Sequence, residues 1–178
     1  MTRKCYRFVT NDLKSQNGNI QWKIGEWVKY DGELKLCNGG LHACFNPTDS
    51  LDNIYGSRWF LAETRGIILE DENKFCATEM RLVKEIPLKV IQLFAVDCAE
   101  HVLPIYEKIY PNDDNVSLCI KMTRAFIENP TEENHRKMDA AAWAARAARD
   151  AVRINWTIEQ KWQNNHLKIL IREALKNE

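Results

Sequence analysis

Residues 138–151, with the sequence MDAAAWAARAARDA, decide how the second half of the chain folds. Alanine has the highest intrinsic helix propensity, so this stretch predicts a helix. At helical spacing its small side chains form one stripe, which contains Ala141, Ala144, Ala145 and Ala148. A helix with so many small side chains can lie close against its neighbours. We therefore expect this element to serve packing and docking rather than catalysis.

The rest of the second half also has helical spacing. Apolar residues recur with a helical period over residues 93–103 and 116–127. Thr131 is followed by two acids that favour the start of a further helix. The last helix either continues straight on from that one or restarts at Thr157, which forms a capping box with Gln160. Pro104 is expected to break or kink the first helix, or to stand in the first turn of the next.

In the last of these helices the pattern predicts a buried face. That face contains Trp162, Ile169 and the edge formed by Leu170 and Ala174.

Up to about residue 88 the sequence is typical of strands and turns. Residues 20–24 alternate between apolar and polar, which predicts a strand with one buried face. Asp31-Gly32 lies between two apolar runs and predicts a tight hairpin, and residues 38–40 predict a second turn. A short helix through residue 55 would be capped by Thr48 or Asp49. Further strands are expected over residues 59–61, 66–69 and 75–83, with a turn at residues 71–73.

These patterns predict an α+β fold with two domains. Residues 1–88 would form a small, mostly antiparallel sheet with one short helix. Residues 89–178 would form a bundle of about four helices, on which the sheet packs. The 178 residues, 45% of them hydrophobic and 28% charged, are enough to build such a core.

The charge balance excludes some classes of partner. Twenty-five basic residues balance 25 acidic ones. A neutral chain argues against a dedicated nucleic-acid binder, whose affinity would come mainly from neutralising phosphates, and against adhesion to anionic membranes. No stretch approaches the roughly 20 apolar residues of a membrane span, and the N-terminus has no signal-peptide pattern. We expect a cytoplasmic protein, in its own cell or in a host, with its six cysteines reduced.

A cluster of metal-ligating residue types stands at residues 37–44. Cys37, His42 and Cys44 could ligate zinc, which prefers nitrogen and sulfur ligands in tetrahedral geometry. The spacing matches no strong zinc pattern, however, and a fourth ligand would have to come from elsewhere. The other interpretation is a turn whose cysteines fill the core, and no metal or cofactor is then expected.

An enzymatic alternative rests on Glu79. A glutamate on a strand, beside a small residue and a threonine, is similar to the catalytic glutamate of nicotinamide-dinucleotide-dependent ADP-ribosyltransferases. Arg7 and His42 are the residues available to position the dinucleotide. Signatures of phosphate-binding loops, dinucleotide folds, zinc proteases and serine hydrolases are absent, which weakens an enzymatic interpretation.

Two stretches carry resemblances to known families. The segment DCAEHVLPIYE at residues 97–107, the segment YPNDD at residues 110–114 and the Ala/Trp/Arg helix together resemble immunity proteins of the immunity-5-like type, over about residues 92–175. Where that family usually has an Arg-Pro-Arg run after the acidic loop, this chain has residues 115–118, NVSL. Residues 5–86 look like an uncharacterised, phage-associated β-rich domain, through pieces such as GLHAC at residues 40–44.

The immunity-like resemblance implies a helical module that binds and neutralises a toxin or effector. We expect a non-enzymatic protein-binding module, encoded by a phage or mobile element, that inhibits a bacterial effector or defence complex, for example as an anti-CRISPR protein. One expected contact group is Trp143, Arg146 and Arg149, because Trp and Arg dominate interface hot spots. The other is the acidic pair Asp113 and Asp114, which could mimic phosphate. The Ala-rich face also suits a homodimer, and core packing is the alternative role of Trp143.

Overall fold

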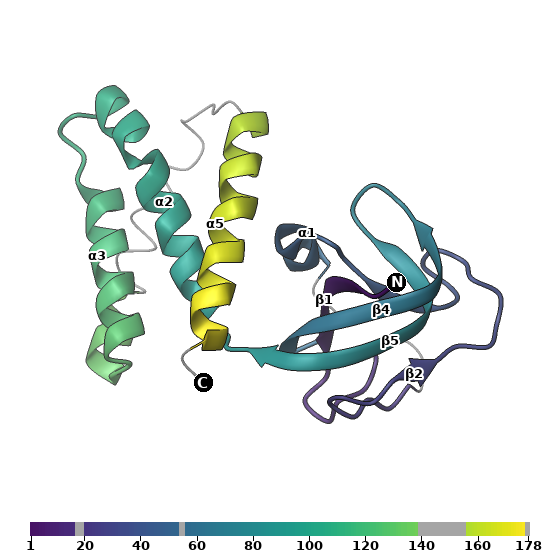
Figure 1. The fold of residues 1–178 in the computed structure, drawn as a ribbon. Helices are drawn as coiled ribbons and strands as arrows, with labels where there is room; N and C mark the ends of the chain where they lie inside the picture. Colours follow the sequence, from purple (N-terminus) through teal and green to yellow (C-terminus); the bar gives the residue numbers. More distant parts are fainter. Residues whose placement is uncertain (17–19, 54–55, 139–155, 177–178) are drawn as a thin grey trace. The chain divides into compact units, whose positions relative to one another are not determined.

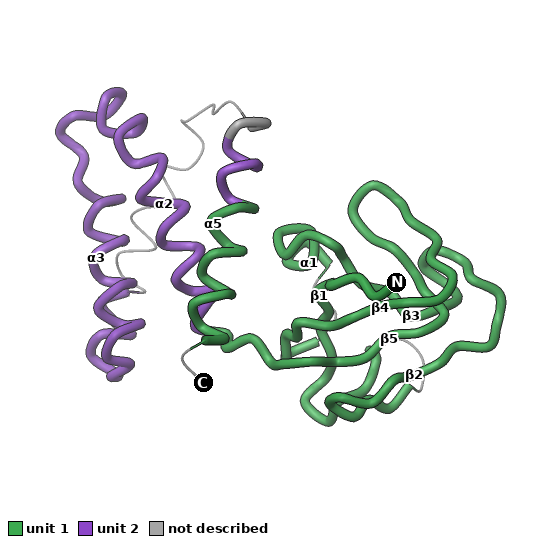
Figure 2. Tube along the Cα trace, viewed as in Figure 1, with its two compact units in different colours: residues 1–88, 164–178 green, residues 89–163 purple. Residues whose placement is uncertain are grey.

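The computed structural model describes residues 1–16, 20–53, 56–138 and 156–176. The chain divides into two compact units, which Figure 2 shows in different colours. The first unit consists of residues 1–88 and 164–178, and the second of residues 89–163. The predicted α+β class is confirmed, with an antiparallel sheet in the first half and helices in the second. The division into domains at residue 88 stays a prediction.

The first unit is built on a five-stranded antiparallel sheet (Figure 1). Its strands are β1 (Arg3–Val9), β2 (Val28–Lys29), β3 (Leu41–Ala43), β4 (Arg58–Glu70) and β5 (Phe75–Ile86). The order is β1-β4-β5-β2, and β3 also pairs with β5. The side chains that face the core are almost completely buried and include Trp22, Leu41, Phe60, Phe75, Met80 and Leu82.

The long β4–β5 hairpin is the largest element of this sheet. The two stretches predicted as separate strands at 59–61 and 66–69 belong to one strand, β4, which is interrupted by register shifts at Leu61/Ala62 and Arg65/Ile68. Gly66 lies in the second shift with φ +81°, a conformation that L side chains rarely adopt. The predicted turn at residues 71–73 is confirmed, and the amide of Asp71 donates to the carbonyl of Lys74 over 2.8 Å.

Two local predictions in this unit are wrong. Residues 20–24 form only an isolated antiparallel bridge, between Gln21 and Lys14, and no strand. The Trp22 amide donates to the Leu13 carbonyl beside this bridge, and the Trp22 indole Nε1 donates to Ser15 Oγ. Asp31-Gly32 closes no hairpin, because Val28–Lys29 pairs instead with Met80 and Glu79 of β5. Long-range pairing with a strand twelve residues long prevails over the local turn signal.

The N-cap of the helix α1 (Pro47–Asp52) lies two residues before Thr48, the first of the predicted cap residues. Asn46 occupies the N-cap position, with Pro47 at the start of the helix, so neither Thr48 nor Asp49 is the cap residue. Inside the helix, Ser50 is buried and its Oγ accepts a hydrogen bond from the Trp59 indole over 3.1 Å. This bond ties α1 to β4.

The second unit contains the antiparallel hairpin of α2 (Lys89–Ile109) and α3 (Asn115–Glu128), seen in Figure 1. Buried Val96, Ile120 and Ile127 form its core. Arg124 of α3 binds two carboxylates of α2, Asp97 at 2.6 Å and Glu100 at 2.5 Å. Apolar contact and charge pairing therefore join the same two helices.

The predicted helix boundaries in this unit are only partly right. Pro104 stands inside α2 and does not end it. Residues 132–138 are helical, as predicted from Thr131, whose Oγ1 accepts from the Asn134 amide over 3.2 Å. The Ala-rich stretch from residue 139 to 151, including its predicted stripe, lies outside the described residues. None of the helices in the described parts of the chain is long and apolar enough to cross a membrane.

The helix α5 (Trp156–Lys176) belongs to both units, and the predicted inward face is partly wrong. Ile169 is 45% exposed, whereas Leu167 and Ile171 are the buried residues, at 0% and 4%. In the first unit, Lys84 Nζ donates to the Leu175 carbonyl over 2.8 Å. Residues 164–178 thus complete the β-rich unit rather than only extending the helical one.

Truncation of Leu167 tests this assignment. We expect Leu167→Ala to lower the free energy of unfolding by about 2–5 kcal/mol, because the lost side chain is fully buried. Ile169→Ala is the matched control on the exposed face of the same helix, with an expected change below about 1 kcal/mol. Urea unfolding followed by circular dichroism measures both. Equal destabilisation by the two variants would contradict the burial pattern.

Candidate functional site

A cavity of about 430 Å³ lies in the first unit. It is formed where the loop before β3 and the strand β3 meet β1. Its lining residues are Tyr6, Arg7, Phe8, Gln16, Cys37, Asn38, Gly40, His42, Ala43, Cys44, Ser50, Asn53 and Lys74. The structure thus brings together four of the residues that the sequence singled out: Arg7, Cys37, His42 and Cys44.

A short bridge between β1 and the end of β3 builds this cavity. The amide of Tyr6 donates to the Cys44 carbonyl over 2.8 Å, and the amide of Cys44 donates back to Tyr6 over 3.1 Å. Gly40 turns the chain into β3 with φ +106°, and an added Cβ would meet Leu34 at 2.7 Å. The turn predicted at residues 38–40 is therefore confirmed, and it places His42 beside Arg7.

Arg7 is the central charged group of the cavity. Its Nη1 donates to the His42 carbonyl and its Nη2 to Ser15 Oγ over 2.7 Å. The guanidinium also lies over the ring of Trp22, 4.7 Å from the centroid. Its Nε is buried without a hydrogen-bond partner among the described residues. Burial lowers the pKa of Arg7 to about 10, since the charged form is poorly solvated there.

The imidazole of His42 is held by backbone groups on both sides. Its Nε2 accepts from the Cys37 amide over 3.0 Å, so in the neutral ring Nδ1 carries the proton and donates to the Gly40 carbonyl over 3.1 Å. Burial, and then the charge of Arg7, lower the pKa of His42. With both ring nitrogens engaged, His42 is poorly placed to bind a metal or to act as a base.

The two cysteines of this cavity differ in environment. Cys37 is exposed, and its Sγ accepts from Lys74 Nζ over 2.9 Å. Cys44 is buried, and burial raises the pKa of its thiol to about 12, so it remains protonated at neutral pH. All six cysteines are free thiols. Within the described residues, no group of three or more His, Cys, Asp or Glu side chains could hold a metal ion.

Glu79 does not line this cavity. Its Oε2 accepts from Arg65 Nε over 2.7 Å, and the Arg65 guanidinium lies 4.0 Å from the centroid of the Trp27 ring. Arg81 lies over the same ring at 4.9 Å and pairs with Glu63. Glu79 thus belongs to a ladder of ion pairs on the sheet. The structure brings together Arg7 and His42 of the predicted dinucleotide site, and it places Glu79 among these ion pairs.

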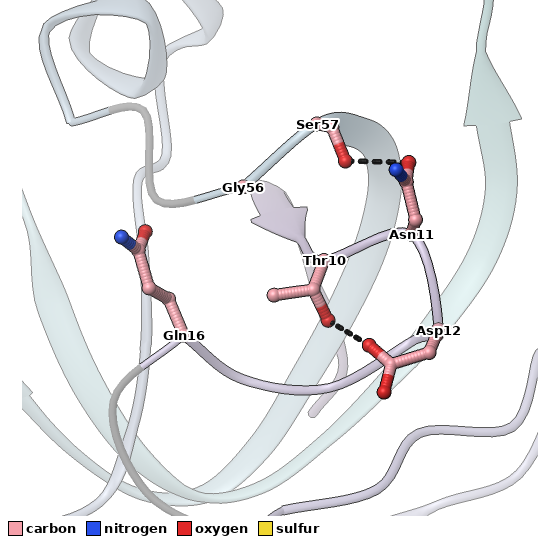
Figure 3. A pocket seen from close by; sticks show the side chains of 6 residues that line it. All are labelled: Thr10, Asn11, Asp12, Gln16, Gly56 and Ser57. Atoms are coloured by element: carbon pink, nitrogen blue, oxygen red, sulfur yellow. Dashed lines mark hydrogen bonds between the residues drawn. The ribbon is translucent and has the colours of Figure 1, made fainter.

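A second hollow, shown in Figure 3, is wide and open to solvent. It has a volume of about 550 Å³ and is lined by Thr10, Asn11, Asp12, Gln16, Gly56 and Ser57. The polar side chains bond to one another: Thr10 Oγ1 donates to Asp12 and Ser57 Oγ donates to Asn11, both over 2.6 Å. The hydrogen bond from Lys14, followed by that from Thr10, lowers the pKa of Asp12. This arrangement stabilises the loop and offers no evident chemistry.

In the second unit, the acidic pair lies in the loop between α2 and α3. Asp113 shapes that loop, since its Oδ2 accepts from the Tyr106 hydroxyl over 2.7 Å and its Oδ1 from the Asn115 amide over 3.0 Å. These bonds, the Asn115 amide first, lower the pKa of Asp113. Asp114 is exposed at the N-cap position of α3, and its side chain makes no cap hydrogen bond.

The same end of the helical hairpin exposes apolar side chains. Ile109, Tyr110 and Leu118 are 50%, 39% and 45% exposed. Tyr110 packs on the ring of buried Tyr106, with 5.0 Å between centroids, so its position is supported. Tyr110 was not among the contact residues predicted from the sequence, although it stands next to the predicted acidic loop. Trp143, Arg146 and Arg149, the other expected contact group, lie outside the described residues.

A polar cluster between α2 and α5 was not predicted from the sequence. The His101 ring stacks on Trp162 with 3.7 Å between centroids, and its Nε2 lies 3.4 Å from Glu159 Oε2. Glu159 is only 4% exposed and accepts from Gln163 Nε2 over 2.9 Å. The partners are about 60 residues apart in the chain, so no local pattern could have joined them.

Comparisons with known families confirm both predicted resemblances. Residues 3–93, just over half of the chain, match the family described as "Domain of unknown function (DUF7666)", and the chain belongs to this family. Residues 81–157 match the family described as "Imm-5 like putative immunity protein". This second match covers α2, the acidic loop and α3, and it supports an immunity-type, non-enzymatic role. Comparisons with curated proteins and with solved structures gave no match.

The titration of His42 tests the geometry of the cavity. We expect its imidazole to titrate below the ordinary pKa of about 6.5, because burial and Arg7 both disfavour the charged ring. A depressed folded-state pKa means that the stability from neutral His42 is complete above about pH 6.5 and is lost as the pH falls through the folded pKa. NMR of the ring protons measures the pKa, with His42→Gln identifying the signal. A pKa at or above 6.5 would contradict this environment.

Proposed function

We propose that this chain is a non-enzymatic module that binds and inhibits a bacterial protein effector. The observation that carries the proposal is the immunity-type match over residues 81–157, a stretch that includes α2, α3 and the acidic loop between them. An inhibitor of this kind needs a rigid element that presents a contact surface. The α2–α3 hairpin, joined by Arg124 and a small apolar core, meets that requirement.

The contact surface that we propose is the loop end of this hairpin. Asp114 offers an exposed carboxylate, and Tyr110 offers an aromatic ring supported by Tyr106. Tyrosine is enriched among interface hot spots, and an acidic group at such a surface favours a basic partner. Asp113 remains part of the proposed acidic contact, and its two hydrogen bonds also fix the loop conformation that presents Asp114.

The finer parts of the proposal concern source and target. We propose that the chain is encoded by a phage or mobile element and acts in the cytoplasm of a bacterial cell. Its target would be a toxin, or a defence complex such as a CRISPR effector, whose nucleic-acid groove is basic and accepts acidic side chains. Trp143, Arg146 and Arg149 remain proposed as a second contact group, and a homodimer remains an alternative use of the Ala-rich face.

The alternative function, a nicotinamide-dinucleotide-dependent transferase, has less support. Its proposed glutamate, Glu79, is paired with Arg65 and does not line the cavity that Arg7 and His42 share.

Charge reversal at Asp114 tests the proposed surface. The tagged chain is used to capture its partner from bacterial lysate at moderate salt, and the captured protein is identified and purified. We expect Asp114→Lys to weaken binding of that protein by about tenfold or more, since an acidic contact is replaced by a repulsive one. The dissociation constant measured by titration calorimetry checks this, together with inhibition of the captured protein's activity.

Glu128→Lys is the matched control. Glu128 is exposed at the opposite end of α3, so this variant makes the same charge change on the same helix. It should bind the partner as tightly as the unaltered chain does. Equal weakening by both variants would remove the loop from the interface, and a captured protein whose activity is unchanged by the chain would contradict the inhibitory role.

A further inference from the structure

We propose that the cavity around Arg7 binds a small organic anion through a carboxylate or phosphate group. This site lies wholly in the first unit, and the inference is independent of the proposed protein binding by the second. Carboxylate and phosphate groups both offer a pair of anionic oxygens that can accept hydrogen bonds from the guanidinium of Arg7.

The positive charge of Arg7 lacks a carboxylate partner among the described residues. Arg7 is a cation on β1 that lies over the ring of Trp22, and none of its hydrogen-bond partners among the described residues is a carboxylate. Among the described residues, the cavity lining contains Arg7 and Lys74 but no aspartate or glutamate. Asp49 and Asp52 influence the nearby Cys44 thiol, yet they do not line the cavity. Buried charges in proteins are normally paired, so an anion entering here would supply what the chain itself lacks.

The guanidinium of Arg7 retains N–H groups that make no hydrogen bond within the described chain. A guanidinium has five N–H groups in a fixed planar fork. Arg7 uses one on Nη1 for the His42 carbonyl and one on Nη2 for Ser15. Each terminal nitrogen therefore retains one N–H group, and Nε has no partner among the described residues. The bonds already made fix the fork in place, so a ligand would meet a preorganised group.

The other five arginines of the first unit differ from Arg7. Arg3, Arg58, Arg65 and Arg81 each pair with a glutamate: Glu70, Glu85, Glu79 and Glu63, in that order. Arg172 is exposed on α5. Arg7 thus lines a cavity and, in the part of the chain that the structure describes, pairs with no carboxylate.

The size and lining of the cavity suit a small molecule. A volume of about 430 Å³ is within the range of ligand pockets in proteins. Tyr6, Phe8 and Ala43 are among the lining residues, and the exposed carboxamides of Gln16 and Asn38 can supply further hydrogen bonds at the opening. A fixed cation and a small number of polar groups that line a cavity are features of ligand pockets in proteins.

Ligand titrations test this inference. The full chain is titrated with inorganic phosphate, adenosine diphosphate and citrate, against chloride at equal ionic strength. We expect at least one of these anions to raise the melting temperature and to shift the NMR signal of the Arg7 Nε–H group. Phosphate-bearing ligands alone, or citrate alone, would identify the anionic group that the site prefers. If none of the three changes either signal at about 10 mM, the inference is wrong.

Two variants separate a specific site from general screening. Arg7→Lys keeps the charge but loses the fork, and it should weaken binding by about tenfold or more. Arg65→Lys makes the same change at an arginine paired with Glu79 outside the cavity, and it should leave binding unchanged. Equal effects of both variants would overturn the proposal. If Arg7→Lys does not fold, the NMR titration of the unaltered chain decides the question.

Discussion

The pairing of β4 with β5 is the constraint on which the first unit depends. The hairpin joins strands of 13 and 12 residues, and β5 also pairs with β2 and β3. Loops that would have little structure alone are thereby ordered against one long strand. The register shifts in β4 curve the hairpin, and the Thr64 hydroxyl donates to the Glu79 carbonyl across it. Trp22, Leu41 and Phe75 are then buried in a common core.

Sequence patterns predicted elements best where local signals and long-range packing agree. The turn at residues 71–73, the turn at residues 38–40 and the helix over residues 116–127 depend on adjacent residues, and all three are present. The prediction of a hairpin at Asp31-Gly32 was wrong because Val28 pairs with Met80, some fifty residues away in the sequence. The prediction that Ile169 is buried was wrong for a related reason. Apolar residues lie on more than one face of α5, and only tertiary packing selects Leu167 and Ile171 for burial.

Candidate site residues were harder to predict than elements. The sequence singled out Arg7, His42 and Glu79 as one group, and the structure joins only the first two. Residue type alone does not reveal which arginine has an acidic partner, since the partners of Arg65 and Arg81 lie on a neighbouring strand. The stacking of His101 on Trp162 likewise depends on contacts between distant segments. The sequence shows which residue types are present, whereas the fold determines which side chains pair with one another.

The helix α5 connects the order of the chain to the order of its folding. Residues 164–178 belong to the first compact unit, although they follow the whole of the second in the sequence. During synthesis on the ribosome, the residues of the sheet would emerge early. The first unit would still lack the buried Leu167 side chain until α5 had been made. Such a unit is exposed to chaperones and proteases for longer than a contiguous domain of equal size. The helical hairpin of α2 and α3 is built from local contacts, so it can fold before α5 has been synthesised.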